Sequence, residues 1–209
     1  MRIVIVGTGT EVGKTHVACA LLHALSARGE DAIGLKPIET GVRGAPEDAL
    51  RLGGIAPRHA FGDPVSPHLA ARRAGVTIEL DEVAGWVRAH SRKWQIIETA
   101  GGLLTPLALG ITNLDLVHEL APAAVVVVAP DRLGTLHDVS AVLCVLGRPV
   151  SVCLSAPAHA DASTGTNAAE LGRLGIAEPI EFPRAPLDDA ATQKAAALLL
   201  ARCSAEETV

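Results

Sequence analysis

Aromatic residues are almost absent from this chain. They make up 2% of its 209 residues, with two Trp, two Phe and no Tyr. Because apolar residues still account for 49% of the chain, Ala, Val, Leu and Ile must form the hydrophobic core. A chain of this length buries about 70–75% of its unfolded surface, and at roughly 150 residues per domain it predicts one domain over residues 1–209. We expect a disordered tail from about residue 204.

Other features are missing as well, and each absence excludes a class of protein. The net charge is −5, without the basic excess that nucleic-acid-binding proteins carry. No run reaches the ~18 consecutive apolar residues of a membrane helix, and the stretch before the first glycine is too short for a secretory signal. The four cysteines lack C-x-x-C spacing. We therefore expect neither a disulfide nor a zinc framework, no membrane or nucleic-acid partner, and a cytoplasmic location.

Short apolar runs alternate with longer amphipathic stretches along the chain. Several runs are continuous in Val and Ile, which is typical of strands buried on both faces of a parallel sheet. We expect strands at 2–6, 32–35, 95–97, 123–129 and 150–154, and helices near 14–28, 80–91, 113–120, 135–146, 168–174 and 188–202. This alternation predicts a three-layer α/β fold, with a mostly parallel central sheet flanked by helices. Segment 39–76 is rich in Gly, Pro and His, and we expect it to be functional or to carry short helices.

The most informative stretch is Gly-Thr-Gly-Thr-Glu-Val-Gly-Lys-Thr at residues 7–15, between the first expected strand and the first expected helix. In this context the N–H groups of the loop and of the helix N-terminus bind an anion, which the helix dipole also favours. Gly13 lets the backbone approach phosphate oxygens, Lys14 supplies a cation for them, and the Thr15 hydroxyl can reach Mg²⁺. The common pattern G-x-x-x-x-G-K-[ST] would have a glycine at Thr8. The stretch predicts a nucleotide site, the alternative being a structural turn.

Three charged residues lie near the carboxyl ends of expected strands, where an α/β sheet gathers its chemistry. Lys36 directly follows the second strand, and Glu98 follows the third, ahead of glycines that admit a phosphate. Asp48 belongs to the first turn of a short helix, where an acid is also favoured for structural reasons alone. The two carboxylates and the Thr15 hydroxyl would form an all-oxygen site that suits Mg²⁺. The structural alternatives are a sheet-edge lysine at 36 and a capping or hinge residue at 98.

Six stretches together carry a resemblance to a known family. They are the loop at 7–15, Lys-Pro-Ile-Glu-Thr-Gly at 36–41, Glu-Asp-Ala at 47–49, Ser-Pro-His at 66–68, Glu-Thr-Ala-Gly-Gly-Leu-Leu-Thr-Pro-Leu at 98–107 and Leu-Gly-Thr-Leu at 133–136. In this order and spacing, over about two-thirds of the chain, they resemble the dethiobiotin synthetases. The loop of that family also lacks the usual first glycine. The resemblance implies a P-loop NTPase-like fold.

The resemblance also implies an activity and a set of site residues. Enzymes of this family take 7,8-diaminononanoate, CO₂ and MgATP to dethiobiotin, ADP and phosphate, in biotin biosynthesis, and they work as homodimers with the diamine close to the subunit interface. Carried across, Lys36 and Lys14 are catalytic, and Thr15, Asp48 and Glu98 hold Mg²⁺. The implied substrate contacts are Thr40, Ser66 and Pro67. The implied nucleotide contacts are Thr10, Glu11, Val12, Gly13, Lys14, Thr15, His16, Asp48, Glu98, Gly101, Ser155, Ala156, Pro183, Arg184 and Ala185.

The chain departs from the usual residues of the family at several positions. Thr99 stands where the family usually has Gly, and Ser155-Ala156 stand where it tends to carry Asn. Leu-Gly-Thr-Leu is followed by His137-Asp138 in place of Asn-His. The sequence leaves open whether the Thr99 side chain crowds the phosphate or the metal. At the base-recognition positions, we expect the choice of ATP over other nucleotides to be loose.

Two other classes of function stay open. One is a nucleotide-driven switch of the same broad phosphate-loop group, which dimerises and regulates a partner. Many such switches carry a second lysine just after the first loop glycine, and here Thr8, Gly9 and Thr10 fill that part of the loop. The other is a catalytically inactive binding module, suggested by Thr99 and Ser155. Phosphate release that depends on the diamine separates the enzyme from both.

Overall fold

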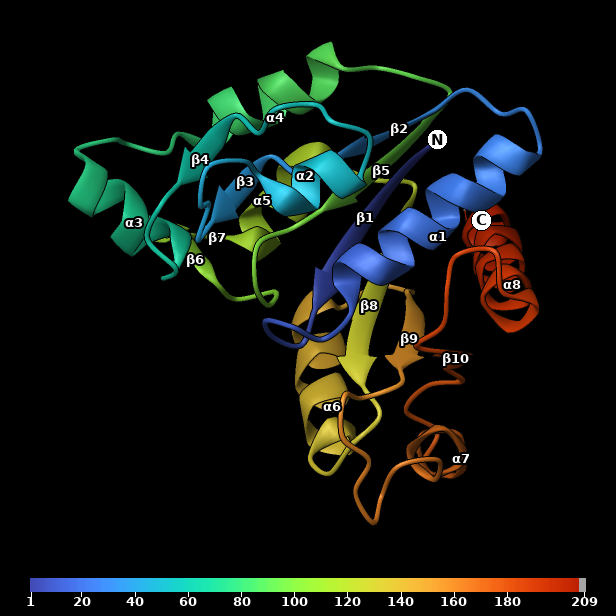
Figure 1. Cartoon of the computed structure of the whole chain (residues 1–209). Coiled ribbons are helices and arrows are strands. Elements are labelled where there is room, and N and C mark those ends of the chain that lie inside the picture. The colour runs from blue at the N-terminus through green and yellow to red at the C-terminus, as the bar shows by residue number, and fades with distance from the viewer. Residues whose placement is uncertain (207–209) are drawn as a thin grey trace.

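The structure, a computed structural model, describes residues 1–206. A six-stranded parallel sheet forms its centre (Figure 1). The strands lie in the order β10-β9-β8-β1-β5-β2. Their bounds are β1 Arg2–Gly7, β2 Ala32–Leu35, β5 Trp94–Glu98, β8 Ala124–Pro130, β9 Ser151–Ser155 and β10 Ile180–Phe182. Every neighbouring pair is parallel, so the carboxyl ends of the strands lie along one edge of the sheet.

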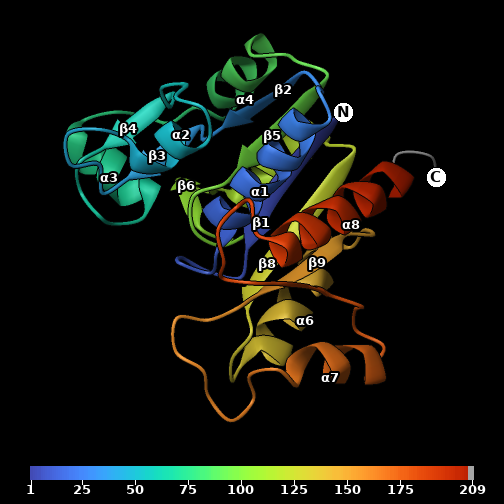
Figure 2. The ribbon, with the colours of Figure 1, turned by 45° about the vertical axis from the view of Figure 1, so that its right-hand side comes forward.

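Helices cover both faces of this sheet, which gives the three layers expected from the sequence (Figure 2). One face packs against α1 (Lys14–Ala27) and α8 (Ala190–Glu206), and the other against α4 (Leu80–Ala89), α5 (Asn113–Leu120), α6 (Thr135–Leu146) and α7 (Asn167–Arg173). The side chains of β1 alternate between the two layers, with Ile3 and Ile5 toward α1 and α8 and with Val4 and Val6 toward the others. Burial on both sides explains the continuous apolar runs.

The predicted α/β fold class is confirmed, and the expected strands and helices are present with most bounds shifted by one or two residues. The sequence did not reveal β10. This strand has only three residues, and exposed Glu181 stands between buried Ile180 and Phe182. So short an alternation cannot be distinguished from a loop.

Segment 39–76 contains short elements of its own, as expected. β3 (Ile38–Thr40) and β4 (His59–Phe61) form a separate two-stranded parallel sheet, which lies beside the β2 edge in Figures 1 and 2. α2 (Glu47–Arg51) and α3 (Pro67–Ala74) belong to the same region. A hairpin of β6 (Pro106–Ala108) and β7 (Ile111–Thr112) follows β5.

The C-terminal helix is longer than the sequence suggested. α8 continues to Glu206, past the residue near 204 at which we expected the tail to begin. Cys203 is fully buried, and the Ser204 hydroxyl donates a hydrogen bond to the Leu200 carbonyl oxygen, so both side chains hold this last turn in place. Residues 207–209 lie outside the described residues. Within residues 1–206, no helix is long and apolar enough to cross a membrane.

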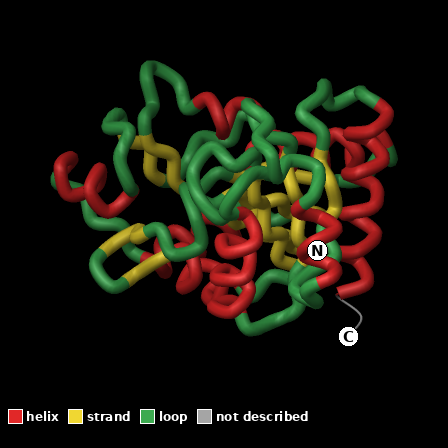
Figure 3. The backbone as a smooth tube through the Cα atoms, turned by 90° about the horizontal axis from the view of Figure 1, so that it is seen from below, coloured by secondary structure: helices red, strands yellow, loops and turns green. Residues whose placement is uncertain are grey.

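Strand register places the candidate residues at the carboxyl edge of the sheet. Ile5 of β1 pairs with Glu98 of β5, and Leu35 of β2 pairs with Ile97. Lys36, which follows Leu35, therefore comes alongside Glu98. Figure 3 views the molecule from below Figure 1 and shows loops crowded around this end of the sheet.

Candidate active site

The loop between β1 and α1 is tightly folded and leaves the first turn of α1 open to an anion. Gly13, just before the helix, has φ +98°, which favours glycine, and no side chain caps the first N–H groups of α1. A Cβ on Gly13 would lie 2.8 Å from Ser155 Oγ, and one on Gly7 would lie 2.9 Å from the Gly9 carbonyl oxygen. Close packing therefore requires both glycines, and the helix N-terminus is available to a phosphate. Thr10 and Glu11 are exposed at the tip of the loop.

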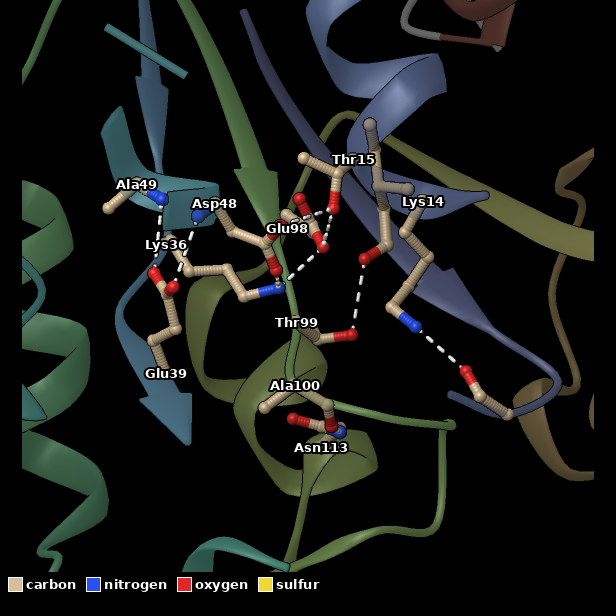
Figure 4. A network of polar contacts seen from close by, with 12 residues as sticks. Lys14, Thr15, Lys36, Glu39, Asp48, Ala49, Glu98, Thr99, Ala100 and Asn113 are labelled. Atoms are coloured by element: carbon tan, nitrogen blue, oxygen red, sulfur yellow. Dashed lines mark hydrogen bonds and ion pairs between the residues drawn. The ribbon is translucent and has the colours of Figure 1, made fainter. Parts of the chain in front are cut away.

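Lys14 reaches back across this loop from the start of α1. Its side chain is buried, and Nζ donates a hydrogen bond to the Gly9 carbonyl oxygen at 2.7 Å (Figure 4). Burial lowers the pKa of Lys14 to about 8, and the nearby Lys36 ammonium adds to this effect. The carboxylates of Glu98 and Asp48 oppose it. A bound phosphate would favour the charged form of Lys14, because opposite charges stabilise one another.

Lys36, Asp48, Glu98 and Thr15 meet beside the phosphate loop (Figure 4). Lys36 Nζ lies 2.5 Å from Glu98 Oε1 and 3.0 Å from Asp48 Oδ2. The Thr15 hydroxyl lies 2.9 Å from Glu98 Oε1 and 3.1 Å from Asp48 Oδ1. The Glu98 side chain is 1% exposed, and its second oxygen, Oε2, has no hydrogen-bond partner among residues 1–206. Two carboxylates, one ammonium and one hydroxyl therefore share a small buried space.

The charges of this cluster support one another. Burial alone would lower the pKa of Lys36, but the carboxylates of Glu98 and Asp48 outweigh it and raise that pKa. Burial alone would raise the pKa of Asp48, but the Lys36 ammonium and the Thr15 hydroxyl hold it below its ordinary value. Lys36 is therefore a cation and Asp48 an anion at neutral pH.

Thr99, which follows Glu98, does not enter the site. Its side chain is buried, and both its hydroxyl and its backbone N–H donate to the Ile5 carbonyl oxygen, at 3.1 and 3.0 Å. The hydroxyl points toward β1, as Figure 4 shows. The Thr99 side chain therefore caps a carbonyl group of β1.

The rest of this loop is held by Asn113, which the sequence analysis missed. Asn113 is the first residue of α5, and its Nδ2 donates to the carbonyl oxygens of Ala100 and Gly102, both at 2.7 Å. A Cβ on Gly102 would lie 3.2 Å from the Thr8 carbonyl oxygen, whereas one on Gly101 would meet Thr105. Gly102 therefore lies against the phosphate loop, and the implied contact of Gly101 with the nucleotide stays a prediction.

The helix that carries Asp48 is also anchored by a residue that the sequence analysis missed. Glu39 is buried, and its two carboxylate oxygens accept hydrogen bonds from the backbone N–H groups of Asp48 and Ala49, both at 3.0 Å (Figure 4). The one signal in the sequence is Pro46, which precedes α2 and has no side-chain group that could cap it. A cap from elsewhere is therefore needed.

The residues implied as substrate contacts lie on the side of the site formed by segment 39–76. Thr40 ends β3, and Pro67 begins α3, which packs on β3, β4 and β6. The Ser66 hydroxyl is 2.9 Å from His68 Nδ1, within the turn that opens α3. A cavity of about 470 Å³ lies on another side of the phosphate loop. It is lined by residues 8–10, by residues 102–106 and by one face of α6.

Ser155 and Ala156, two of the residues implied as contacts of the nucleotide base, form hydrogen bonds within the protein at the end of β9. The Ser155 hydroxyl, at the end of β9, donates to the Val12 carbonyl oxygen at 2.6 Å. The Ala156 N–H donates to the Phe182 carbonyl oxygen at 2.9 Å. Both donor groups are therefore already engaged in hydrogen bonds within the protein. Ser155 packs against Gly13 and holds the phosphate loop through Val12.

The segment Pro183, Arg184, Ala185 follows β10 and meets the start of α1. His16 Nε2 is 3.0 Å from the Pro183 carbonyl oxygen, and the ring packs edge-on against Phe182 at a centroid distance of 5.8 Å. Burial lowers the pKa of His16, and the charge of Arg184 adds to this effect. The structure thus brings this C-terminal segment next to the phosphate loop, as the resemblance requires.

Curated relatives of this chain carry the name of one family. The family model described as an AAA domain matches residues 1–152. The chain is 39% identical, over 193 residues, to a protein of Anaeromyxobacter dehalogenans (strain 2CP-C) named ATP-dependent dethiobiotin synthetase BioD, with 84% of this chain and 86% of that one covered. It is 37% identical, over 161 residues, to the protein of that name from Caulobacter sp. (strain K31), with 68% of each chain covered. The chain belongs to the dethiobiotin synthetase family.

Two solved structures share the fold of this member of the dethiobiotin synthetase family. The MinC:MinD cell division protein complex of Aquifex aeolicus matches with a TM-score of 0.55 at 14% identity, over 93% of this chain and 86% of that one. The signal recognition particle receptor FtsY of Elizabethkingia anophelis matches with a TM-score of 0.53 at 13% identity, over 93% of this chain and 63% of that one. At these identities the likeness concerns the fold alone.

Proposed function

We propose that this chain forms dethiobiotin from 7,8-diaminononanoate and CO₂, with conversion of ATP to ADP and phosphate. The observation that carries the proposal is the meeting of Lys36, Asp48, Glu98 and Thr15 beside the phosphate loop. Relatives named dethiobiotin synthetase cover most of the chain, which supports the same reaction.

The reaction brings two anions together, and the lysines of the site suit that task. One amine of the substrate captures CO₂ as a carbamate, and a carbamate oxygen then attacks the γ-phosphorus and expels ADP. Like charges at ~4 Å repel by about 4 kcal/mol at an effective dielectric constant of 20. Lys14 and Lys36, both buried at the loop, would offset this repulsion and stabilise the charge that develops in the transition state. The second amine then attacks the mixed anhydride, closes the ring and releases phosphate.

The residues present fit a magnesium ion. Thr15, Asp48 and Glu98 would hold it, and all the donor atoms are oxygens, as Mg²⁺ prefers. The buried Glu98 Oε2, which has no partner within residues 1–206, is the specific observation in favour. No group of three or more His, Cys, Asp or Glu side chains gathers as a metal site in the described part of the chain. Two carboxylates and one hydroxyl are few ligands for a metal ion held by protein alone. They suit a Mg²⁺ ion that is also bound by nucleotide phosphates and neutralises their charge.

The substrate side and the oligomeric state belong to the same proposal. We place the diamine on the side of the site formed by segment 39–76, where the implied contacts Thr40, Ser66 and Pro67 lie. The family resemblance carries the homodimer in this proposal, with the diamine close to the subunit interface. The scattered cysteines support a cytoplasmic location for this chemistry.

The nucleotide-driven switch is not favoured. The relatives that cover two thirds or more of the chain are named synthetases. Thr8, Gly9 and Thr10 also fill the part of the loop where many switches carry a second lysine.

The experiment is a phosphate-release assay with purified protein, Mg²⁺, bicarbonate and each nucleoside triphosphate, with and without the diamine. The enzyme releases phosphate only when the diamine is present. Nucleotide hydrolysis that ignores the diamine would indicate a switch, and binding without any release would indicate an inactive module. In the same assay, Lys36→Ala lowers turnover more than it lowers nucleotide affinity, because the lysine acts on the reacting groups.

A further inference from the structure

The first turn of α2 is held in place by a residue outside the helix. Pro46 stands at its N-cap and gives no side-chain hydrogen bond. Glu39, which is 7% exposed, supplies the missing acceptors, with Oε1 3.0 Å from the Asp48 nitrogen and Oε2 3.0 Å from the Ala49 nitrogen. Both oxygens of one carboxylate therefore pair with consecutive N–H groups, in a charge-assisted contact that is stronger than a neutral one.

Few other contacts fix this turn. α2 has only five residues, Glu47–Arg51, and only Ala49 among them is buried. The Asp48 side chain is 35% exposed, so packing alone does not set its direction. Its two oxygens nevertheless reach Thr15 at 3.1 Å and Lys36 at 3.0 Å. The backbone of Asp48 is fixed by Glu39 while its side chain faces the site.

We propose that Glu39 is a positioning residue for the metal–nucleotide site, and that it acts through Asp48. This inference rests on the proposed function, because it assigns Asp48 to the magnesium ion. Glu39 is not itself a ligand in this arrangement, since both of its oxygens already accept backbone N–H groups. It stands three residues after Lys36, so one short segment carries the lysine and fixes the carboxylate that the lysine contacts.

The variant Glu39→Gln tests this role. The amide keeps the shape of the side chain but turns one acceptor into a donor that faces a backbone N–H. The probe is Mn²⁺, titrated into the protein with a non-hydrolysable ATP analogue and followed by electron paramagnetic resonance. Replacing residues that orient metal ligands typically weakens metal affinity by about 10–100-fold, and we expect at least a tenfold loss. Affinity for the analogue without metal stays within about twofold of the wild type.

Glu47→Gln is the matched control, because it removes the same charge from the first turn of the same helix. Glu47 is exposed, and its variant keeps wild-type Mn²⁺ affinity. Glu39→Asp keeps the charge but shortens the side chain, so it gives a smaller loss than Glu39→Gln. If Glu39→Gln does not fold, Glu39→Asp carries the test. Wild-type Mn²⁺ affinity in every folded Glu39 variant overturns the proposal.

A double-mutant cycle with Asp48→Asn separates positioning from a general effect of charge or stability. If Glu39 acts through Asp48, then Glu39→Gln weakens Mn²⁺ binding no further once Asp48 has been replaced. A second tenfold loss in the Asp48→Asn background contradicts the proposal. The cycle needs no diamine. A wild-type protein without diamine-dependent phosphate release would therefore refute the proposed reaction and leave this test intact.

Discussion

Replacing Lys36 with methionine keeps the length of the side chain and removes the cation between two carboxylates. Glu98 is then left 1% exposed and without its ammonium partner, and Asp48 loses its contact as well. Removing one partner of a buried ion pair costs about 3–5 kcal/mol, and the lower end applies here because the Asp48 side chain is 35% exposed. At about 2–4 °C per kcal/mol for a chain of this size, Lys36→Met lowers Tm by about 6–12 °C in a metal-free buffer.

The assay is thermal unfolding followed by circular dichroism, in EDTA and in millimolar Mg²⁺. The divalent ion neutralises the two carboxylates in the variant, whereas in the wild type it must compete with the Lys36 ammonium. Mg²⁺ therefore raises Tm more in Lys36→Met than in the wild type. Lys93→Met is the matched control, because Lys93 pairs with Glu30 at 2.5 Å while 63% exposed. An exposed pair contributes at most about 1 kcal/mol. Equal Tm values for Lys36→Met and the wild type in EDTA would refute the reasoning.

Three further predictions follow from single residues. Gly13→Ala adds a Cβ 2.8 Å from Ser155 Oγ at a φ of +98°, so backbone strain of about 1–2 kcal/mol and crowding of about 1–3 kcal/mol both lower the free energy of unfolding. Gly134→Ala is the control, because its φ is +96° and its Cβ would meet no atom within 4 Å, so urea unfolding of this variant measures the strain alone. Thr99→Gly removes a buried hydrogen bond and lowers stability by about 1–2.5 kcal/mol, while turnover stays within twofold and Thr99→Ser retains the bond. Burial and the charge of Arg58 lower the pKa of His59, although Glu82 lies 3.8 Å away. As the pH falls, His59 is therefore protonated in the unfolded chain at a higher pH than in the folded protein. Stability is therefore full above about pH 6.5 and falls as the pH drops toward the folded pKa; the urea midpoint of His59→Gln falls less between pH 7.5 and 5.5 than that of the wild type.

The sheet and much of the candidate site could be predicted because both depend on local pattern and on the geometry of parallel strands. Val and Ile runs marked the strands; Lys36 directly follows β2, and Glu98 is the last residue of β5. Carboxyl ends of parallel strands meet at one edge, so these two residues had to come near the loop that follows β1. The register of β2 on β5 then brings Lys36 beside Glu98.

The sequence did not reveal the contacts made by Glu39, Asn113 and Thr99, because each depends on where a side chain points relative to a residue many positions away in the chain. Glu39 caps a helix that begins eight residues later, and nothing in its neighbours shows where its carboxylate points. Asn113 holds a loop eleven and thirteen residues away. The direction of the Thr99 side chain depends on the Ile5 carbonyl oxygen, 94 residues earlier in the chain, which accepts the hydroxyl as well as the Thr99 N–H.

Two of the departures from the family pattern, Thr99 and Ser155, each place a hydroxyl group on a carbonyl oxygen. A loop that turns its N–H groups toward a phosphate must turn some carbonyl oxygens away from it, into the protein, and buried carbonyl groups need donors. The Ser155 hydroxyl donates to the Val12 carbonyl in the loop. The Thr99 hydroxyl adds a second donor to the Ile5 carbonyl in the strand before it, which already accepts the Thr99 N–H. Because the only proton of the Ser155 hydroxyl is already donated, that group can accept a hydrogen bond from a base but cannot donate one. A base that presents an acceptor at this point must find its donor elsewhere, so comparing nucleoside triphosphates in the phosphate-release assay tests how strongly Ser155 limits the choice of nucleotide.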